Sequence, residues 1–351
     1  MLTRILNYLQ TKKELQFRFL KAAPFLKKGR YFSNETGTLW YPKRWKEKAL
    51  PENKYLYQQI VYHNDRAIHA KTKIGKQLQT VRRKLINHFH CGQVTLKNPS
   101  LLYDGDVALL FRKPGAGKII NYSKKEILSF FREKKQMQEI FEKQSTWQSF
   151  GYPAPAILQT DEEHLFLIEE YIEKQDFSPE AGFEFIKNDI LLHQKACGDD
   201  GLIVCLPEEL AEKVEGLKRL EGEWEGVSGV IDFIQSPNYI KRVCHGDLYR
   251  NNLIFDGQKF WYIDFELLCP RVFFFDVVVY FLYEFLIFEN DKMLKDFFAG
   301  KYDAYFSELF SVNHSVYDPA MKKAYLFLTL YECFCECFKC PIPFQKLKSI
   351  F

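Results

Sequence analysis

The spacing of apolar and polar positions changes near residue 94. Before this point apolar residues are sparse among many cationic ones, and the segment 55–89 contains no proline and one glycine, which predicts a long surface helix or a pair of helices. After it, short apolar runs predict strands, with a turn at 113–117 between the last two. The predicted strands are 93–96, 106–111 and 118–122. The pattern therefore predicts a basic helical extension over residues 1–92, followed by a sheet.

A second group of elements follows these strands. Ser123 with Glu126 fits a capping box, which predicts a charged helix over 123–144. An apolar run at 164–172 predicts another strand, and beyond it helical spacing dominates, interrupted by one pair of short strands. The order of elements predicts an α+β fold in which a small mixed sheet precedes a mainly helical part.

The composition is that of a folded protein. Of the 351 residues 47% are hydrophobic, 17% aromatic and 27% charged, which excludes an ordinary disordered chain. The most apolar run, 272–288, contains Asp276 and Glu284, so we do not expect it to span a membrane. The first residues lack the apolar core of a secretory signal, and the nine cysteines show no disulfide spacing. We therefore expect a cytoplasmic protein with reduced thiols.

Charge is distributed unevenly along the chain. Residues 1–90 hold 20 Lys and Arg against 5 Asp and Glu, a local charge of +15, so the formal net charge of +4 leaves −11 for the other 261 residues. A basic segment of this kind can face nucleic acid, an anionic membrane surface or a phosphorylated glycan. A solvated basic surface without a partner is the alternative.

The segment 244–264 carries the clearest chemistry. It reads CHGDLYRNNLIFDGQKFWYID, in which Asn252 follows Asp247 by five residues and Asp264 follows Asn252 by twelve. Two apolar runs joined by an Asp-Gly turn predict a hairpin between the last two. A carboxylate can orient a hydroxyl and accept its proton, whereas an amide oxygen and a second carboxylate on a rigid hairpin can hold Mg²⁺ against nucleotide phosphates.

The motif HGDLYRNN followed by YIDFE resembles the catalytic loop and metal-binding segment of the aminoglycoside phosphotransferase and choline kinase superfamily. The resemblance implies a bilobal protein-kinase-like fold, with a nucleotide-binding lobe over 93–172 and a helical lobe over 173–351 that carries the catalytic loop and the acceptor site. It also implies ATP and Mg²⁺ as cofactors, Asp247 as the catalytic base, and Asn252 and Asp264 as Mg²⁺ ligands. The implied activity is transfer of the γ-phosphate to an alcohol group.

The same resemblance gives roles to residues around the loop. In related kinases a buried aspartate accepts hydrogen bonds from the catalytic-loop backbone, and this role is implied for Asp276. We expect His245 to be a packed structural residue. The run 164–172 resembles the family's hinge, which implies that the backbone carbonyl of Glu170 and the backbone amide of Ile172 meet the adenine edge.

The nucleotide-binding lobe departs from the family's pattern. A kinase has a lysine on its third strand, paired with a glutamate on the following helix. Glu133 is the natural glutamate, but the run KIINY places Asn121 where the lysine is expected and leaves Lys118 at the start of the strand. Either Lys118 reaches the phosphates, or another residue such as Arg112 does. This gap favours an alternative function, that of a pseudokinase which binds nucleotide without turnover.

The acceptor is less well defined. The region after Asp264 is rich in Phe and Tyr and bears Glu266, Glu284 and Glu289, and acidic and aromatic walls suit a cationic or hydroxylated acceptor. We expect a small molecule, an amino alcohol or a cell-surface glycan precursor, and a peripheral association with an anionic membrane through residues 1–90. A nucleic-acid-binding protein is a further alternative, although the sequence contains no recognition motif for it.

Four clustered cysteines raise the question of a metal site. They lie in the run YLFLTLYECFCECFKC, which reads as a buried helix in which thiols pack as small hydrophobic groups. A zinc site normally draws its ligands from loops in paired spacings, so we do not expect one here. The four are Cys333, Cys335, Cys337 and Cys340.

Overall fold

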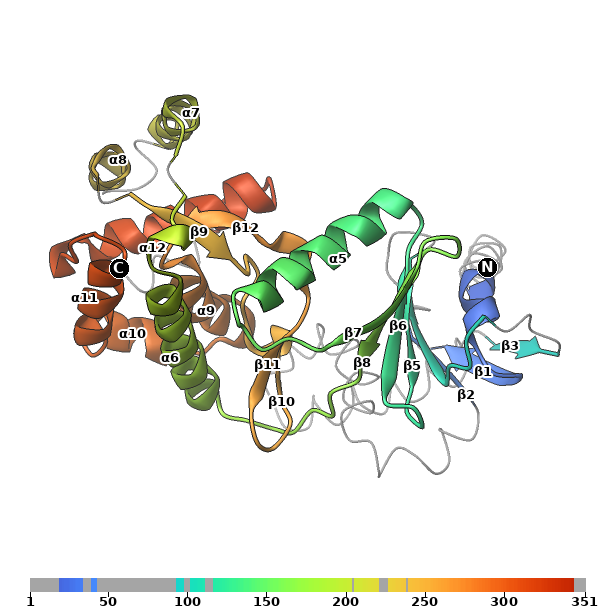
Figure 1. Cartoon of the computed structure of the whole chain (residues 1–351). Helices are drawn as coiled ribbons and strands as arrows, with labels where there is room; N and C mark the ends of the chain where they lie inside the picture. The colour runs from blue at the N-terminus through green and yellow to red at the C-terminus, as the bar shows by residue number, and fades with distance from the viewer. Residues whose placement is uncertain are drawn as a thin grey trace, which may run out of the picture. The chain divides into compact units, whose positions relative to one another are not determined.

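A computed structural model of the chain shows two compact units (Figure 1). The first consists of residues up to 141 with 155–174, and the second of residues 142–154 with those from 175 onward. The described residues are 19–33, 39–42, 93–97, 102–110, 116–203, 205–220, 227–237 and 239–343. Across these ranges no helix has the length and apolar character needed to cross a bilayer.

The first unit is built on an antiparallel sheet with the strand order β3-β1-β2-β4-β5-β6-β8-β7. Its strands are β1 (Gly29–Ser33), β2 (Leu39–Pro42), β3 (Gln93–Leu96), β4 (Val107–Leu110), β5 (Gly117–Asn121), β6 (Glu126–Phe130), β7 (Ile157–Asp161) and β8 (Phe166–Glu170). Because side chains alternate between faces, Ile119 and Leu128 enter one core while Ile120 enters another. The short 3-10 helix η1 (Ala23–Phe25) packs with the first of these cores through Phe25.

The sheet corrects the prediction that residues 1–92 form a separate helical extension. β1 pairs with β2, and β2 pairs with β4, so residues 29–33 and 39–42 continue the sheet of the first unit. The ring centroids of Phe19 and Trp40 lie 4.4 Å apart, and both side chains are fully buried. Tyr31 is almost completely buried. Burial of these large aromatic side chains explains why β1 and β2 belong to the sheet although the segment around them is rich in Lys and Arg. The surface helix predicted over 55–89 is not part of this correction. Residues 43–92 lie outside the described ranges.

A second correction concerns the helix predicted over 123–144. The structure has the strand β6 at Glu126–Phe130, and α5 (Lys134–Ser149) begins only afterwards. The Ser123 hydroxyl does not cap a helix but donates to Asn121 Oδ1 (2.8 Å), closing the turn from β5 to β6. Leu128 and its neighbours pair on both sides with β5 and β8, and this tertiary pairing overrides the local capping pattern.

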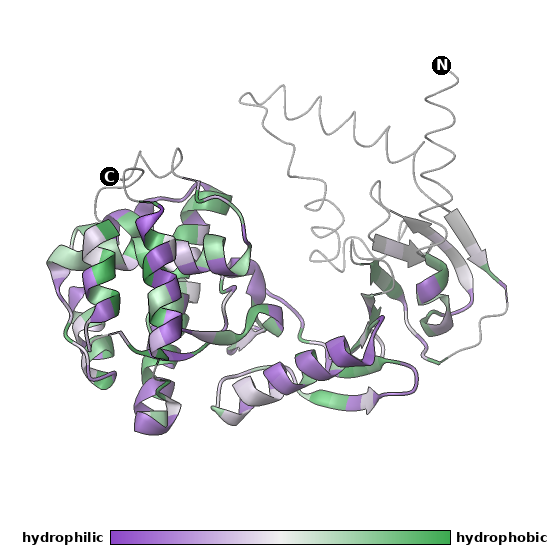
Figure 2. Ribbon diagram, turned by 90° about the horizontal axis from the view of Figure 1, so that it is seen from above, coloured by the Kyte–Doolittle hydropathy of each residue, from purple (hydrophilic) through white to green (hydrophobic). Residues whose placement is uncertain are grey.

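The second unit is mainly helical, and its helices carry apolar and polar residues together (Figure 2). Two short antiparallel pairs accompany them, β9 (Lys241–Cys244) with β12 (Cys269–Val272), and β10 (Leu253–Phe255) with β11 (Phe260–Tyr262). The helices are α6 (Pro179–Cys197), α7 (Pro207–Lys218), α8 (Val227–Gln235), α9 (Phe275–Phe288), α10 (Lys292–Phe298), α11 (Asp303–Val312), α12 (Lys322–Leu330) and the π-helix η7 (Tyr331–Cys337), with 3-10 turns η3 (Gly198–Gly201), η4 (Arg250–Asn252), η5 (Phe265–Leu267) and η6 (Pro319–Met321).

Helix α9 is the centre of this unit. It contains most of the apolar run 272–288, it packs against α6, α10 and α12, and its residues from Phe275 to Glu284 are all buried. The prediction of an α+β protein, with a sheet followed by a mainly helical part, is confirmed.

Candidate active site

Asp247 lies on the loop that links β9 to η4, and α9 holds this loop in place. Asp276, in the first turn of α9, accepts hydrogen bonds from the backbone N–H groups of His245 (2.7 Å) and Gly246 (3.0 Å), as predicted. Gly246 has a φ of 82°, and a Cβ atom there would lie 2.2 Å from the carbonyl oxygen of Leu267. Only glycine fits this close approach, so a residue with a Cβ atom could replace Gly246 only if the loop moved.

His245 is a packed structural residue, as predicted. Its ring is completely buried, with centroids 5.7 Å from Trp147 and 5.3 Å from Phe265. Nε2 donates to the carbonyl oxygen of Ile263 (3.0 Å), which links the loop to the end of β11. Burial lowers the pKa of His245 to about 4, so the ring is neutral at neutral pH.

Asn252 closes the loop onto Asp247. Its Nδ2 atom donates both to the backbone oxygen of Asp247 (2.8 Å) and to the carboxylate Oδ2 (3.1 Å). The backbone oxygen of Asn252 accepts from the N–H of Ile263 (3.1 Å). Because Nδ2 donates both hydrogen bonds to Asp247, the orientation of the Asn252 amide is fixed. Oδ1 is therefore the atom that can coordinate a cation.

Asp264 lies two residues after the end of β11. The β10–β11 pairing places Leu253 opposite Tyr262, so the residues flanking the hairpin, Asn252 and Asp264, are brought to the same end of it. Asp264 has a left-handed backbone conformation (φ 72°) and an exposed side chain. Such a φ is uncommon outside glycine, and residues held there cluster at functional sites.

The environment of Asp247 suits a proton acceptor. Burial, followed by the negative charge of Asp264, raises the pKa of the Asp247 carboxyl to about 6, while hydrogen bonds from Tyr283 and Asn252 work in the opposite direction. A carboxyl with this pKa is mostly ionised at neutral pH and is a stronger base than an ordinary aspartate.

The donor set fits a hard cation. Asn252 offers an amide oxygen and Asp264 a carboxylate, and Mg²⁺ commonly takes one or two such protein ligands together with phosphates and water. After burial, the negative charge of Asp264 is the next cause of the raised pKa of Asp247, and a bound divalent cation would offset this charge. The described residues contain no group of three or more His, Cys, Asp or Glu that could bind a metal without such external ligands.

The first unit holds the residues predicted to bind nucleotide. The strand on which the lysine was expected needs correction. The strand that precedes α5 is β6, not β5, and it contains no lysine. Lys118 lies on β5 with Ser129 of β6 as its Cα partner, so the two side chains leave the same face of the sheet. Asn121 is fully buried and donates to the carbonyl oxygen of Asp104 (2.7 Å), which makes it a structural residue. Arg112 lies outside the described ranges.

Glu133 lies immediately before helix α5, and its pairing with a lysine stays a prediction. Helix α5 begins at Lys134, and the exposed Glu133 lies in the bend before it, where its backbone oxygen accepts from Met137 N–H (3.3 Å). The adenine contacts stay predictions. Glu170 ends β8, and Ile172 is buried two residues later.

One acidic residue expected to line the acceptor site is already paired. Glu284 is fully buried and accepts from Arg250 Nε (3.1 Å) and Nη2, and from Asn290 Nδ2 (3.3 Å). The Arg250 guanidinium also lies 4.3 Å from the centroid of the Phe288 ring. Glu284 therefore anchors the loop 245–252 to α9 through Arg250, whereas Glu266 and Glu289 are exposed.

The cysteine-rich run forms the π-helix η7, and its thiols have separate surroundings. Cys333 is buried against the Tyr283 hydroxyl (3.3 Å), Cys337 accepts a hydrogen bond from the Arg271 guanidinium, and Cys340 is exposed. Free thiols thus pack or bond singly here.

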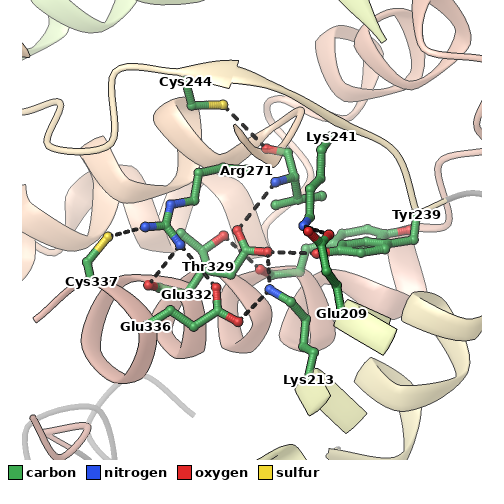
Figure 3. A network of polar contacts seen from close by, with 12 residues as sticks. Glu209, Lys213, Tyr239, Lys241, Cys244, Arg271, Thr329, Glu332, Glu336 and Cys337 are labelled. Carbon is green, nitrogen blue, oxygen red and sulfur yellow. Dashed lines mark hydrogen bonds and ion pairs between the residues drawn. The ribbon is translucent and has the colours of Figure 1, made fainter. Parts of the chain in front are cut away.

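A buried ion network that the sequence did not reveal holds η7 to β12 (Figure 3). Glu332 is fully buried and accepts from Lys213 Nζ (2.7 Å), Tyr239 Oη (2.9 Å) and the backbone N–H of Val272 (3.3 Å). Glu336 pairs with both Lys213 (2.8 Å) and Arg271 (3.1 Å). Since β12 pairs with β9, this network supports the strand that leads into the loop 245–252.

Tyr283 is the site residue that sequence reasoning missed. Its hydroxyl lies 3.3 Å from Cys333 Sγ, and hydrogen bonding from Tyr283 is one of the influences that lower the pKa of the Asp247 carboxyl. A signal was present, because Tyr283 follows Asp276 by seven residues, and this spacing places both on one face of a helix.

No protein-family model and no curated protein matches the sequence. Solved structures similar to this chain are those of aminoglycoside phosphotransferases and choline kinases. An aminoglycoside phosphotransferase from Streptomyces rimosus is 14% identical, with 61% of this chain and 88% of that chain covered and a TM-score of 0.40. The choline kinase LicA from Streptococcus pneumoniae is 15% identical, with 63% and 90% covered and a TM-score of 0.34. A choline/ethanolamine kinase family protein from Mesorhizobium loti is 15% identical, with 67% and 88% covered and a TM-score of 0.32.

Proposed function

We propose that this protein is a phosphotransferase that moves the γ-phosphate of ATP to a hydroxyl group of a small molecule. The observation that carries the proposal is the joint placement of Asp247, Asn252 and Asp264. Asn252 bonds directly to the Asp247 carboxylate at 3.1 Å, and Asp264 lies close enough to raise the pKa of Asp247. Phosphoryl transfer needs positioning and charge neutralisation more than covalent chemistry, and these three residues supply both.

Each residue has a defined task in this proposal. Asp247 orients the acceptor hydroxyl and accepts its proton. Asn252, through Oδ1, and Asp264, through its carboxylate, would hold Mg²⁺, which neutralises phosphate charge when it is bound. Asp276 keeps the loop rigid by accepting two of its backbone N–H groups, so Asp247 needs no rearrangement to act.

The charges near Asp247 support a cationic or polyhydroxylated acceptor. Asp264 and Glu266 are exposed, and both raise the pKa of Asp247, so the local field is negative. Glu284 is paired with Arg250. The proposal of such an acceptor therefore rests on the carboxylates of Asp264 and Glu266. An amino alcohol, a sugar or a cell-surface glycan precursor matches this chemistry.

The test is an acceptor screen. ATP consumption by the full chain is measured with Mg²⁺ against a panel of amino alcohols, sugars and glycan precursors, alongside Asp247→Asn. Turnover that depends on one acceptor class and is lost in Asp247→Asn supports the proposal. Equal ATP consumption by both proteins with every acceptor would overturn it.

The absence of a lysine on β6 favours a second candidate, nucleotide binding without turnover. Ser129 stands on this strand at the position facing Lys118, and its hydroxyl contacts the Glu169 carboxylate (3.4 Å). The same register also supports turnover. The Lys118 side chain leaves the sheet beside Ser129, so it can supply the positive charge for the phosphates from the neighbouring strand. Activity that depends on Lys118 separates the two candidates.

A further inference from the structure

Asp264 has a backbone conformation that its surroundings must hold. Its φ of 72° and ψ of 69° are left-handed, and a residue with a Cβ atom adopts this conformation at a cost. Asp264 also stands immediately before the three-residue turn η5. Such a conformation persists only where surrounding contacts fix the chain. The contacts on the two sides of Asp264 therefore decide where its carboxylate lies.

The chain before Asp264 is fixed by buried contacts. Tyr262 is fully buried, and its hydroxyl donates to Asp189 of α6 at 2.9 Å. The carbonyl oxygen of the next residue, Ile263, accepts from the His245 ring at 3.0 Å. These contacts tie the end of the hairpin to α6 and to the candidate catalytic loop.

The chain after Asp264 is held by α5. The Lys143 ammonium donates to the backbone oxygen of Glu266 at 2.5 Å. One turn further along the helix, the buried Trp147 packs against Phe265, with ring centroids 6.2 Å apart. Residues four apart lie on one face of a helix, so one face of α5 contacts two successive residues of η5. This part of α5 belongs to the second unit, as η5 does.

The hydrogen bond from Lys143 acts on the path of the chain. Its acceptor is a backbone oxygen, whereas the side chain of Glu266 is exposed. The donor is charged, and charge-assisted hydrogen bonds are stronger than those between neutral groups. Groups that orient a metal ligand without touching the metal contribute strongly to metal affinity. A lysine that fixes the chain two residues after Asp264 can therefore affect what Asp264 binds.

We propose that Lys143 is a positioning residue for Asp264. By holding the carbonyl oxygen of Glu266, it keeps η5 against α5 and keeps the backbone of Asp264 left-handed, which sets the position of the carboxylate. For its effect on nucleotide binding the inference rests on the proposed function, in which Asp264 would hold Mg²⁺. For its effect on the backbone of residues 264–266 it does not.

The first experiment measures by calorimetry how far Mg²⁺ raises the affinity of the full chain for ATP. Lys143→Met cannot donate, whereas Lys143→Arg keeps a charged donor. The matched control is Lys135→Met, on the same helix, where the lysine side chain is 85% exposed. We expect the effect of Mg²⁺ to fall about tenfold in Lys143→Met and to be largely restored in Lys143→Arg. A change within about twofold in Lys143→Met, or an equal loss in Lys135→Met, would overturn the role.

A double variant tests whether Lys143 acts through Asp264. Asp264→Ala removes the carboxylate that Lys143 is proposed to position. Adding Lys143→Met to Asp264→Ala should therefore cause little further loss of the effect of Mg²⁺, whereas independent contributions would multiply. Losses that multiply would show that Lys143 acts by another route, and the positioning role would be rejected.

Crystal structures of the parent and of the lysine variants give a readout that needs neither nucleotide nor activity. We expect residues 264–266 to shift or to occupy two conformers in Lys143→Met, and to keep one conformer in Lys135→Met. An unchanged backbone in Lys143→Met overturns the positioning role. A shifted backbone, in a protein whose parent shows no effect of Mg²⁺ on ATP binding, keeps the positioning role and rejects the proposed function instead.

Discussion

Asn252 Nδ2 donates to two atoms of Asp247, the backbone oxygen at 2.8 Å and the carboxylate Oδ2 at 3.1 Å. One side chain thereby fixes both the path of the loop and the orientation of the carboxylate at its tip. The same amide group presents its oxygen for a cation, so the candidate base and the candidate metal ligand form one unit. A change at either residue should affect the other.

Asp247→Asn should abolish phosphoryl transfer while Mg·ATP binding survives. The substitution is nearly isosteric and removes only the proton acceptor, whose contribution is typically about 100-fold or more. Rates and calorimetric ATP affinities are measured for this variant and for Asp232→Asn, an exposed aspartate of α8. A rate for Asp247→Asn within about tenfold of the parent would exclude general-base catalysis by Asp247.

Asp264→Ala should weaken the magnesium dependence of ATP binding. In the parent, Mg²⁺ is expected to raise the affinity for ATP because the carboxylate of Asp264 shares the cation with the phosphates. Calorimetry with and without Mg²⁺ measures this difference, with Glu266→Ala, an exposed neighbour, as the matched control. If Asp264→Ala keeps the full effect of Mg²⁺, Asp264 is not a ligand.

His245 should make stability depend on pH. Its folded-state pKa of about 4 lies below the ordinary 6.5, so its stabilising contribution is present above pH 6.5 and is lost as the pH falls toward 4. The loss amounts to about 3 kcal/mol. The raised pKa of Asp276, about 6, acts in the opposite direction over the same range, so a comparison of variants is required.

His245→Gln isolates this contribution, because glutamine can still donate to the Ile263 carbonyl but does not titrate. Urea unfolding of the parent and of His245→Gln between pH 4 and 7 should show a smaller loss of stability on acidification in the variant. Parallel pH profiles would show that His245 is not the group responsible.

Lys118 should be essential for turnover, and its role should be transferable to β6. Lys118→Met is expected to abolish ATP turnover with the fold intact. Because Lys118 and Ser129 are Cα partners, the double variant Lys118→Met/Ser129→Lys places a lysine on the same face of the next strand and should regain part of the activity. Full activity in Lys118→Met would assign the phosphate contact to another residue. An inactive parent that still binds ATP would favour the pseudokinase.

The basic segment 43–92 should attach the protein to anionic membranes. It holds 12 Lys and Arg against 3 Asp and Glu. Each cation near an anionic surface is worth on the order of 1 kcal/mol, and salt screens the attraction. Vesicle co-sedimentation, with anionic and neutral lipids at low and high salt, measures the effect.

The residues that flank the segment 43–92 lie close enough to be joined by a short linker. The flanking residues Pro42 and Gln93 pair with Tyr31 and Phe32 on opposite sides of β1, about 10 Å apart, so a Gly-Ser linker of about six residues can join them. The excised protein should keep its fold and lose salt-sensitive binding. Equal sedimentation of both proteins would show that the segment is not an electrostatic anchor. Removing residues 1–90 is a poorer test, because it also removes β1 and β2.

The sequence by itself determined the loop 245–252, which is the candidate catalytic loop, and the hairpin that follows it. The hairpin forms around Asp256 and Gly257 as predicted, with Asp256 Oδ1 accepting the backbone N–H groups of Gln258 and Lys259 (2.8 Å each) and Gly257 at a φ of 98°. These are local interactions, and short-range spacing specifies them. The same holds for the loop, in which Asn252 is five residues from Asp247.

Only the tertiary structure decided the remaining features, because they depend on partners far away in the sequence. Residues 126–130 carry a capping pattern but form a strand, since β5 and β8 lie on either side of them. The sequence suggests that Glu284 lines the acceptor site, but the structure pairs it with Arg250, 34 residues away. Glu332 meets Lys213 across 119 residues. Which polar groups meet inside a core is fixed by packing, and no local pattern encodes it.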